Sequence, residues 1–162
     1  MIKKGFLVLF LLTLFAGCKS EPYIERNAFQ LDTSDRTLAL LTETRWDKPI
    51  RKKLAWYGFP VKHYTLAKKG ATENERKSAA RRAGIRYGLR IIPGEVVDQC
   101  IANKSAIKFD TFRIELIDLR KDEVELIIEK GGWIETCPLA SPAFNFTPLF
   151  QELIETFVKQ WW

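Results

Sequence analysis

Polar and apolar residues alternate with a period of two along two neighbouring segments in the second half of the chain, 107–119 and 124–128. In the first segment a charged residue separates Phe112 from Ile114, and the second segment repeats this spacing. A period of two is typical of antiparallel strands that bury one face and expose the other. The pattern therefore predicts a long hairpin with a polar turn at residues 118–123.

A short apolar run at residues 37–41 predicts a buried strand. We interpret residues 61–66 and 86–92 as two further strands. Pro93 and Gly94 interrupt the third strand, because this pair favours a break or a bulge. We expect residues 96–102 to continue it as extended chain.

Two helices are predicted by residues that commonly begin and end helices. Asp47 can cap the first helix, with a proline in its first turn, and Gly58 can close it. The segment Thr72–Glu75 has the form of a capping box, and Gly84 sits where a helix-ending glycine belongs. The chain thus predicts helices after the first strand and before the third.

A last helix follows Thr147, which is a suitable cap, and Pro148, which suits the first position. Its apolar residues form one wide stripe: Leu149, Phe150, Leu153, Ile154, Phe157, Val158 and Trp161. Each such side chain contributes about 1.5–3 kcal/mol when fully buried, before entropy is subtracted. Because its polar face is acidic, we expect a core helix and not a helix lying on an anionic membrane.

These elements follow one another in the order β-α-β-α-β-β-β-α. The order favours an α+β domain, in which helices on one face of a mixed sheet form a two-layer sandwich. We assign residues 36–162 to this single domain, since their number and composition suit one globular core. Residues 18–35 are charged and lack a clear period, and we interpret them as a tether.

Residues 1–17 have the layout of a secretory signal peptide. Two lysines are followed by an uncharged run, Phe6–Gly17, whose 12 residues are too few for a membrane span of about 20. The run ends in the letters LFAGC, which resemble the lipobox of bacterial lipoproteins. This resemblance implies cleavage before Cys18 and acylation of its thiol and amino group, with palmitate among the chains. An ordinary signal peptide that ends near a cysteine is the alternative.

The lipobox resemblance also implies a location. In a Gram-negative cell, Lys19 after the cysteine implies export to the outer membrane, where the domain faces the periplasm. The membrane is then one partner, through the lipid on Cys18.

Cys100 and Cys137 form an even pair in a chain that is expected to be exported, so we predict a disulfide. A loop of this length contributes roughly 4 kcal/mol in the chain-entropy model. A reactive thiol or a metal ligand is the alternative. Neither cysteine has a histidine or another cysteine at ligand spacing, and we predict no metal site and no cofactor.

Charge is unevenly distributed along the chain. Residues 45–90 hold 14 Lys or Arg against three acids, whereas residues 91–162 hold seven against 12. This asymmetry indicates either an anionic partner or two halves that neutralise each other within one fold. The candidate anion-binding residues are Arg51, Lys52, Lys53, Arg76, Arg81 and Arg82. Outside the cytoplasm we expect no nucleic-acid partner.

No catalytic set is recognisable. His63 is the single histidine and lies in a predicted strand, and the chain has no nucleophile elbow, P-loop, dinucleotide fingerprint or zincin motif. We therefore predict that the protein is not an enzyme, with an unrecognised hydrolase that uses His63 as the alternative.

Residues 81–91 and 112–128 resemble the amino-terminal domain of TolB and related outer-membrane lipoproteins, including the curli-secretion lipoprotein and penicillin-binding-protein activators. The first stretch is a helix end that runs into a glycine-bearing strand, and the second is a hairpin built like IELID…EVEL. The resemblance covers most of residues 36–162 in topology. It implies a periplasmic interaction module without catalytic residues.

Together these patterns favour a membrane-anchored envelope lipoprotein that binds another envelope protein. The long aromatic loop 130–146 and the uneven charge motivate this hypothesis. The alternative binding function is recognition of anionic envelope polymers or lipids, such as lipopolysaccharide or peptidoglycan.

Overall fold

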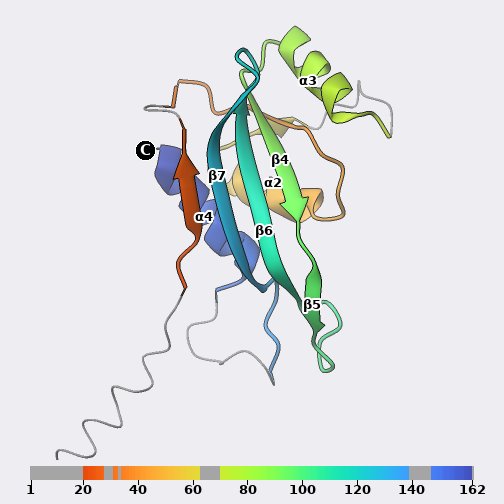
Figure 1. The fold of residues 1–162 in the computed structure, drawn as a ribbon. Coiled ribbons are helices and arrows are strands. Elements are labelled where there is room, and N and C mark those ends of the chain that lie inside the picture. The colour runs from red at the N-terminus through yellow and green to blue at the C-terminus, as the bar shows by residue number, and fades with distance from the viewer. Residues whose placement is uncertain (1–19, 28–30, 33, 63–69, 139–146, 162) are drawn as a thin grey trace, which may run out of the picture.

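The computed structural model describes residues 20–27, 31–32, 34–62, 70–138 and 147–161. Within this part of the chain, seven strands form one sheet and three helices pack against it (Figure 1). The strands are β1 (Tyr23–Arg26), β2 (Leu38–Leu40), β3 (Val61–Lys62), β4 (Tyr87–Pro93), β5 (Val96–Gln99), β6 (Ile107–Asp118) and β7 (Glu123–Trp133). The helices are α2 (Asp47–Trp56), α3 (Glu73–Arg82) and α4 (Leu149–Trp161).

The sheet is mixed and open, with the strand order β1-β7-β6-β4-β2-β3 and with β5 paired to β6. β2 runs parallel to both β3 and β4, whereas the other neighbouring strands are antiparallel. The predicted α+β class with a mixed sheet is confirmed, and α2 and α4 form the helical layer of the predicted sandwich. The prediction that the helices lie on one face holds for these two helices but not for α3.

The predicted hairpin is the centre of the sheet. β6 and β7 pair along most of their length, and β7 continues to Trp133, beyond the predicted end at residue 128. A bulge sets Asp110 and Thr111 of β6 opposite Gly131 of β7. Such a bulge bends the strand pair and strengthens its twist. The extension was missed because the glycines at 131 and 132 interrupt the alternation.

α2 and α4 cover one face of the sheet and enclose the main hydrophobic core (Figure 1). α4 buries five side chains there: Leu149, Leu153, Ile154, Phe157 and Trp161. Phe157 and Trp161 also meet the ring of Phe59, at centroid distances of 5.4 and 5.1 Å. The last helix is therefore a core element, as its apolar stripe predicts.

α3 packs at one end of the sheet on a second, smaller cluster. Successive residues of β2 separate the two cores, because Leu38 and Leu40 join the main cluster while Ala39 and Leu41 join the one under α3. Since neighbouring side chains of a strand point to opposite faces, α3 covers part of the face opposite α2 and α4. α3 begins with the predicted capping box at Thr72.

The cap of α2 lies one residue earlier in the chain than predicted. Trp46 occupies the cap position and Asp47 is the first helical residue. The Asp47 carboxylate accepts hydrogen bonds from the backbone N–H and hydroxyl of Thr44, at 3.0 and 2.5 Å. Gly58 ends the helix with φ of +82°.

β1 corrects the interpretation of residues 18–35 as a tether. Residues 23–26 form a strand that pairs antiparallel with β7, placing Ile24 opposite Ile128. The edge of β7 otherwise presents unpaired backbone groups, and pairing with β1 satisfies them. Sequence pattern misses this strand because its four side chains are all exposed and give no apolar alternation.

Two other predicted strands differ in extent. β3 comprises Val61 and Lys62, and the rest of predicted strand 61–66 lies outside the described residues. β5 is a separate strand beside β6, with a register shift between Val96 and Asp98. It ends at Gln99, so the predicted extended chain of 96–102 is shorter than expected.

Candidate functional site

The sheet face that α2 and α4 leave open carries a continuous ion-pair network. Its members alternate in sign from β7 to α3: Glu129, Arg113, Glu115, Arg90, Glu73, Lys77, Asp122 and Arg81. The Arg113–Glu129 and Arg90–Glu115 contacts each measure 2.6 Å. Lys77, Arg81 and Arg90 thus pair with acids of the second half, which neutralises part of the uneven charge within the fold.

The pKa of the Glu73 carboxyl depends on its ion-pair partners in this network. Burial alone would raise the pKa of the Glu73 carboxyl, but hydrogen bonds from Arg90 and Lys77 together outweigh burial and lower the pKa. The carboxylate is therefore ionised at neutral pH, which suits a structural anion and not a proton donor.

The structure does not bring the six predicted anion-binding residues onto one surface. Arg51, Lys52 and Lys53 lie on α2, and the other three lie on α3. Because the two helices cover opposite faces of the sheet, the six residues are divided into two groups.

In the α3 group, only Arg82 has no ion pair or hydrogen bond among the described residues. Arg76 is 2% exposed and pairs with Glu43 at 2.6 Å. Arg81 pairs with Asp122 at 3.3 Å and donates a hydrogen bond to the carbonyl of Leu119. The long separation of these partners in the sequence explains why pattern alone did not assign them.

On the other face, cations of α2 and β3 gather around a shallow pocket of about 450 Å³. Lys48, Arg51, Lys52 and Lys62 contribute to its lining, and no ion pair occupies them within the described ranges. Trp56 lies one turn away with 85% of its surface exposed, next to Lys52. We call these five residues the α2 basic surface. The third predicted cation of this helix, Lys53, donates to the side chain of Gln151 at 3.2 Å.

The exposure of Trp56 follows from its position on the helix. Ile50 and Leu54 define the buried side of α2, and Trp56 lies off that stripe. A large aromatic residue on the polar side of a helix predicts exposure, and exposed aromatic residues are enriched where proteins bind partners.

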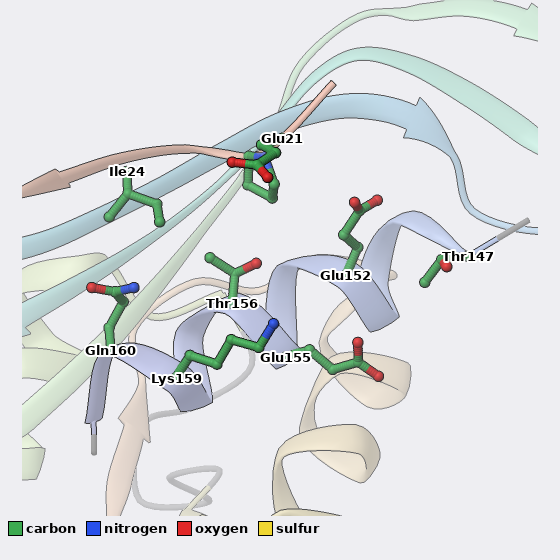
Figure 2. A pocket seen from close by; sticks show the side chains of 9 residues that line it. Glu21, Ile24, Thr147, Glu152, Glu155, Thr156, Lys159 and Gln160 are labelled. Atoms are coloured by element: carbon green, nitrogen blue, oxygen red, sulfur yellow. The ribbon is translucent and has the colours of Figure 1, made fainter. Parts of the chain in front are cut away.

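A second pocket lies between β1 and α4, with a volume of about 380 Å³. Figure 2 shows Glu152, Thr156 and Lys159 along α4, with Ile24 of β1 across from them. Lys130 pairs with Glu152 at 2.7 Å, and the Tyr57 hydroxyl donates to Glu155 at 3.1 Å. The two carboxylates that α4 contributes, Glu152 and Glu155, are thus already partnered, as in a polar seam between elements.

The third distinctive region is the β5 tip, defined as residues 96–105. Val96, Val97 and Ile101 expose 51%, 53% and 93% of their surfaces. Cys100, in the middle of the tip, forms a disulfide with Cys137, with an S–S length of 2.04 Å. The disulfide expected from the cysteine count is therefore present.

In the part of the chain that the structure describes, no three His, Cys, Asp or Glu side chains come together in a way that could hold a metal ion. Among the same residues, no helix combines the length and apolar character that a membrane span requires. His63, Cys18 and residues 139–146 of the predicted loop lie outside the described residues.

No model of a protein family matches the chain, and no curated protein matches it. The likeness to TolB-type modules therefore stays a prediction.

Solved structures share the fold at low sequence identity. A PelC dodecamer from Paraburkholderia phytofirmans aligns with a TM-score of 0.50 and 15% identity, over 86% of this chain and 96% of that one. A PelC variant from the same organism gives 0.48 and 15%, over 86% and 97%. The lipoprotein GNA1162 from Neisseria meningitidis gives 0.39 and 13%, over 76% and 96%. The chain is thus similar to PelC in fold.

Proposed function

We propose that this chain is a bacterial envelope lipoprotein that is held to a membrane through Cys18 and acts by binding another protein, without catalysis. The observation that carries the proposal is the short apolar run that ends in a lipobox-like LFAGC. The Cys100–Cys137 disulfide supports an oxidising compartment, because disulfides persist mainly outside the cytoplasm. Lys19 favours the periplasmic face of the outer membrane.

A binding role is supported by how the polar residues are used. The charges on the open sheet face hold strands and α3 together, and Glu152 and Glu155 of the β1–α4 pocket have partners. Charged side chains that bond within the domain stabilise its fold. The strand edges and loop tips are then the parts of the domain that can contact a partner. Within the described residues, β1 and β3 end the main strand order, and β5, which pairs with β6 alone, presents a third free edge.

The first partner to test is a second copy of the chain. The PelC of similar fold is a dodecamer, and exposed strand edges are natural sites for pairing between chains. A different envelope protein is the other partner that this proposal includes.

The anchor is tested by expressing the full precursor and a Cys18→Ser variant in a Gram-negative host with an alkyne-tagged palmitate. We expect label and membrane fractionation for the parent chain, and loss of both for the variant. Equal labelling of the two proteins, or a parent chain found in the soluble periplasmic fraction, would contradict the proposal.

Binding is tested by crosslinking in living cells followed by mass spectrometry, with the lipidated chain as bait and the Cys18→Ser variant as control. Mass photometry of the purified chain then measures self-association. A monomeric chain that captures no envelope protein above the control would count against a binding role.

The α2 basic surface favours a second candidate function, recognition of an anionic envelope polymer such as lipopolysaccharide. Lys48, Arg51 and Lys52 line one shallow pocket, and Lys52 also lines a second one with the exposed Trp56. Such a combination can contact both charged groups and sugar rings. Since each exposed ion pair contributes up to about 1 kcal/mol, Arg51→Gln with Lys52→Gln should weaken binding by about tenfold. Arg82→Gln on α3 is the matched control and should leave binding unchanged. Equal binding by all three proteins would eliminate this candidate.

A further inference from the structure

The β5 tip exposes apolar side chains that a soluble domain has reason to bury. Val96 and Val97 are about half exposed, and Ile101 is almost fully exposed. Grouped apolar exposure of this kind marks contact surfaces in folded proteins.

The structure holds this exposed group firmly in place. Cys100 is buried and bonded to Cys137, and it packs with Ala106 and Trp133. Asn103 donates a hydrogen bond to the carbonyl of Thr136 at 3.2 Å. The tip is therefore fastened from both sides of Ile101, with its apolar side chains turned outward.

The described chain begins at the same end of the sheet. Val96 lies opposite Phe109, and Phe109 lies opposite Gly132 of β7. On the far side of β7, the Lys130 ammonium donates a hydrogen bond to the carbonyl of Ser20. Because neighbouring strands lie about 4.8 Å apart, Ser20 is roughly 15 Å across the sheet from Val96. Figure 1 shows β5 at the end of the sheet where β1 begins.

Cys18 precedes Ser20 by two residues. A chain spans at most about 3.6 Å per residue, so the Cys18 backbone lies within about 7 Å of Ser20. Acyl chains on that cysteine would bring the bilayer surface to this end of the sheet. We propose that the β5 tip inserts Val96, Val97 and Ile101 into the interface of the membrane that holds the anchor, an inference that rests on the lipidation proposed above.

Charges around the tip have both signs, which indicates the kind of contact. Glu95, Asp98 and Glu135 are exposed acids, the last of them hydrogen-bonded to Ser105 of the tip, and Lys104 and Lys108 are exposed bases. The attraction of the bases to anionic lipid and the repulsion of the acids largely cancel. The tip should therefore enter uncharged membranes, and added salt should change its insertion little.

The test uses the full lipidated chain in vesicles of phosphatidylethanolamine and phosphatidylcholine. The photoreactive residue p-benzoylphenylalanine replaces Ile101 in one protein and Trp56 in the control, since both positions are strongly exposed but lie on different elements. We expect several-fold more lipid adducts from position 101 than from position 56, with little change at high salt.

Three results overturn the inference. Equal lipid adducts from the two positions in vesicle-bound protein exclude insertion of the tip while leaving the anchor intact. Adducts from position 101 to a second copy or to another protein reassign the tip as a protein-binding edge. Failure of the parent chain to bind vesicles overturns both the anchor and the inference.

A second variant guards against misfolding of the photoreactive proteins. Val97→Asp combined with Ile101→Asp places charges on exposed positions, so the fold should persist by circular dichroism. Hydrogen exchange of residues 96–101 should slow on vesicles for the parent chain and stay unchanged for the variant. Equal exchange of the parent chain with and without vesicles contradicts insertion.

Discussion

Gly131 has no room for a side chain, because it lies opposite both residues of the β6 bulge, Asp110 and Thr111. A Cβ atom at this position would stand 2.0 Å from the carbonyl oxygen of Asp110. We predict that Gly131→Ala lowers the free energy of unfolding by about 3 kcal/mol, as overpacking against backbone does. Urea denaturation measures the change.

Gly84 supplies the matched control for that substitution. It has φ of +75° and open space around its missing Cβ, so alanine there meets conformational strain without a clash. Gly84→Ala should cost about 1 kcal/mol, the usual penalty for a left-handed conformation. If the two variants were equally stable, steric crowding at the bulge would not be what requires glycine.

Asp118 is a buried carboxylate with several donors around it. Burial alone would raise its pKa, but hydrogen bonds from the backbone N–H groups of Arg120 and Lys121 and from the Arg86 guanidinium outweigh burial. The pKa of Asp118 therefore lies below its ordinary value. A lowered pKa in the folded chain means that Asp118 stabilises the fold above the unfolded pKa of about 3.9 and loses this effect as pH falls through the folded pKa.

Asp118→Asn should lower the free energy of unfolding at pH 7 by about 1–3 kcal/mol, because the donors lose a charged acceptor. The difference from the parent chain should shrink below about pH 4, because the unfolded parent chain then binds a proton at Asp118 that the folded chain binds only at lower pH. Denaturation curves at several pH values measure this, with Asp98→Asn on exposed β5 as the control. A difference that stayed constant with pH would contradict the assignment.

At the scale of elements, sequence pattern located what depends on local spacing. Phe112 and Ile114 marked the hairpin, Thr72 marked the start of α3, and Leu153 with Phe157 marked the core side of α4. Each signal comes from residues within one or two turns or a few strand positions. β1 was missed because its place depends on β7, far away in the chain.

The candidate site was less predictable for the same reason. Sequence grouped Arg76 and Arg81 with the cations of α2 by charge alone. Their partners Glu43 and Asp122 become neighbours only after the sheet forms. Exposure of Trp56 was readable from the helical wheel, whereas the apolar β5 tip depends on which strand lies at an edge.

The disulfide is the covalent link between the β5 tip and the chain after β7. Replacing both Cys100 and Cys137 with serine should lower the free energy of unfolding by roughly 4 kcal/mol, because the unfolded chain gains freedom. Chemical denaturation with and without reductant measures the loss. Reductant should destabilise the parent chain and leave the double variant unaffected; a variant as stable as the parent would contradict the prediction.

For the whole molecule, β1 protects an edge of the sheet. A chain that starts at Asn27 lacks β1 and exposes the outer edge of β7, whereas a chain that starts at Ser20 keeps it. We predict that the shorter chain aggregates at lower concentration, because an exposed edge can pair with other chains. Light scattering at increasing concentration compares the two. Identical behaviour would mean that β1 is dispensable as an edge cover.

The pairing of β1 with β7 also sets an order of events during biogenesis. β1 is synthesised early, yet Tyr23 must wait for Glu129 to be made before it can pair. Contacts between such distant residues form slowly, since closing a long loop precedes any gain from the pairing. We therefore expect the segment around Cys18 to stay extended and accessible to export and processing enzymes while the chain is being made. Closure of the sheet then follows completion of the chain, and under the lipidation proposed above it would fix the domain near its anchor only at that point.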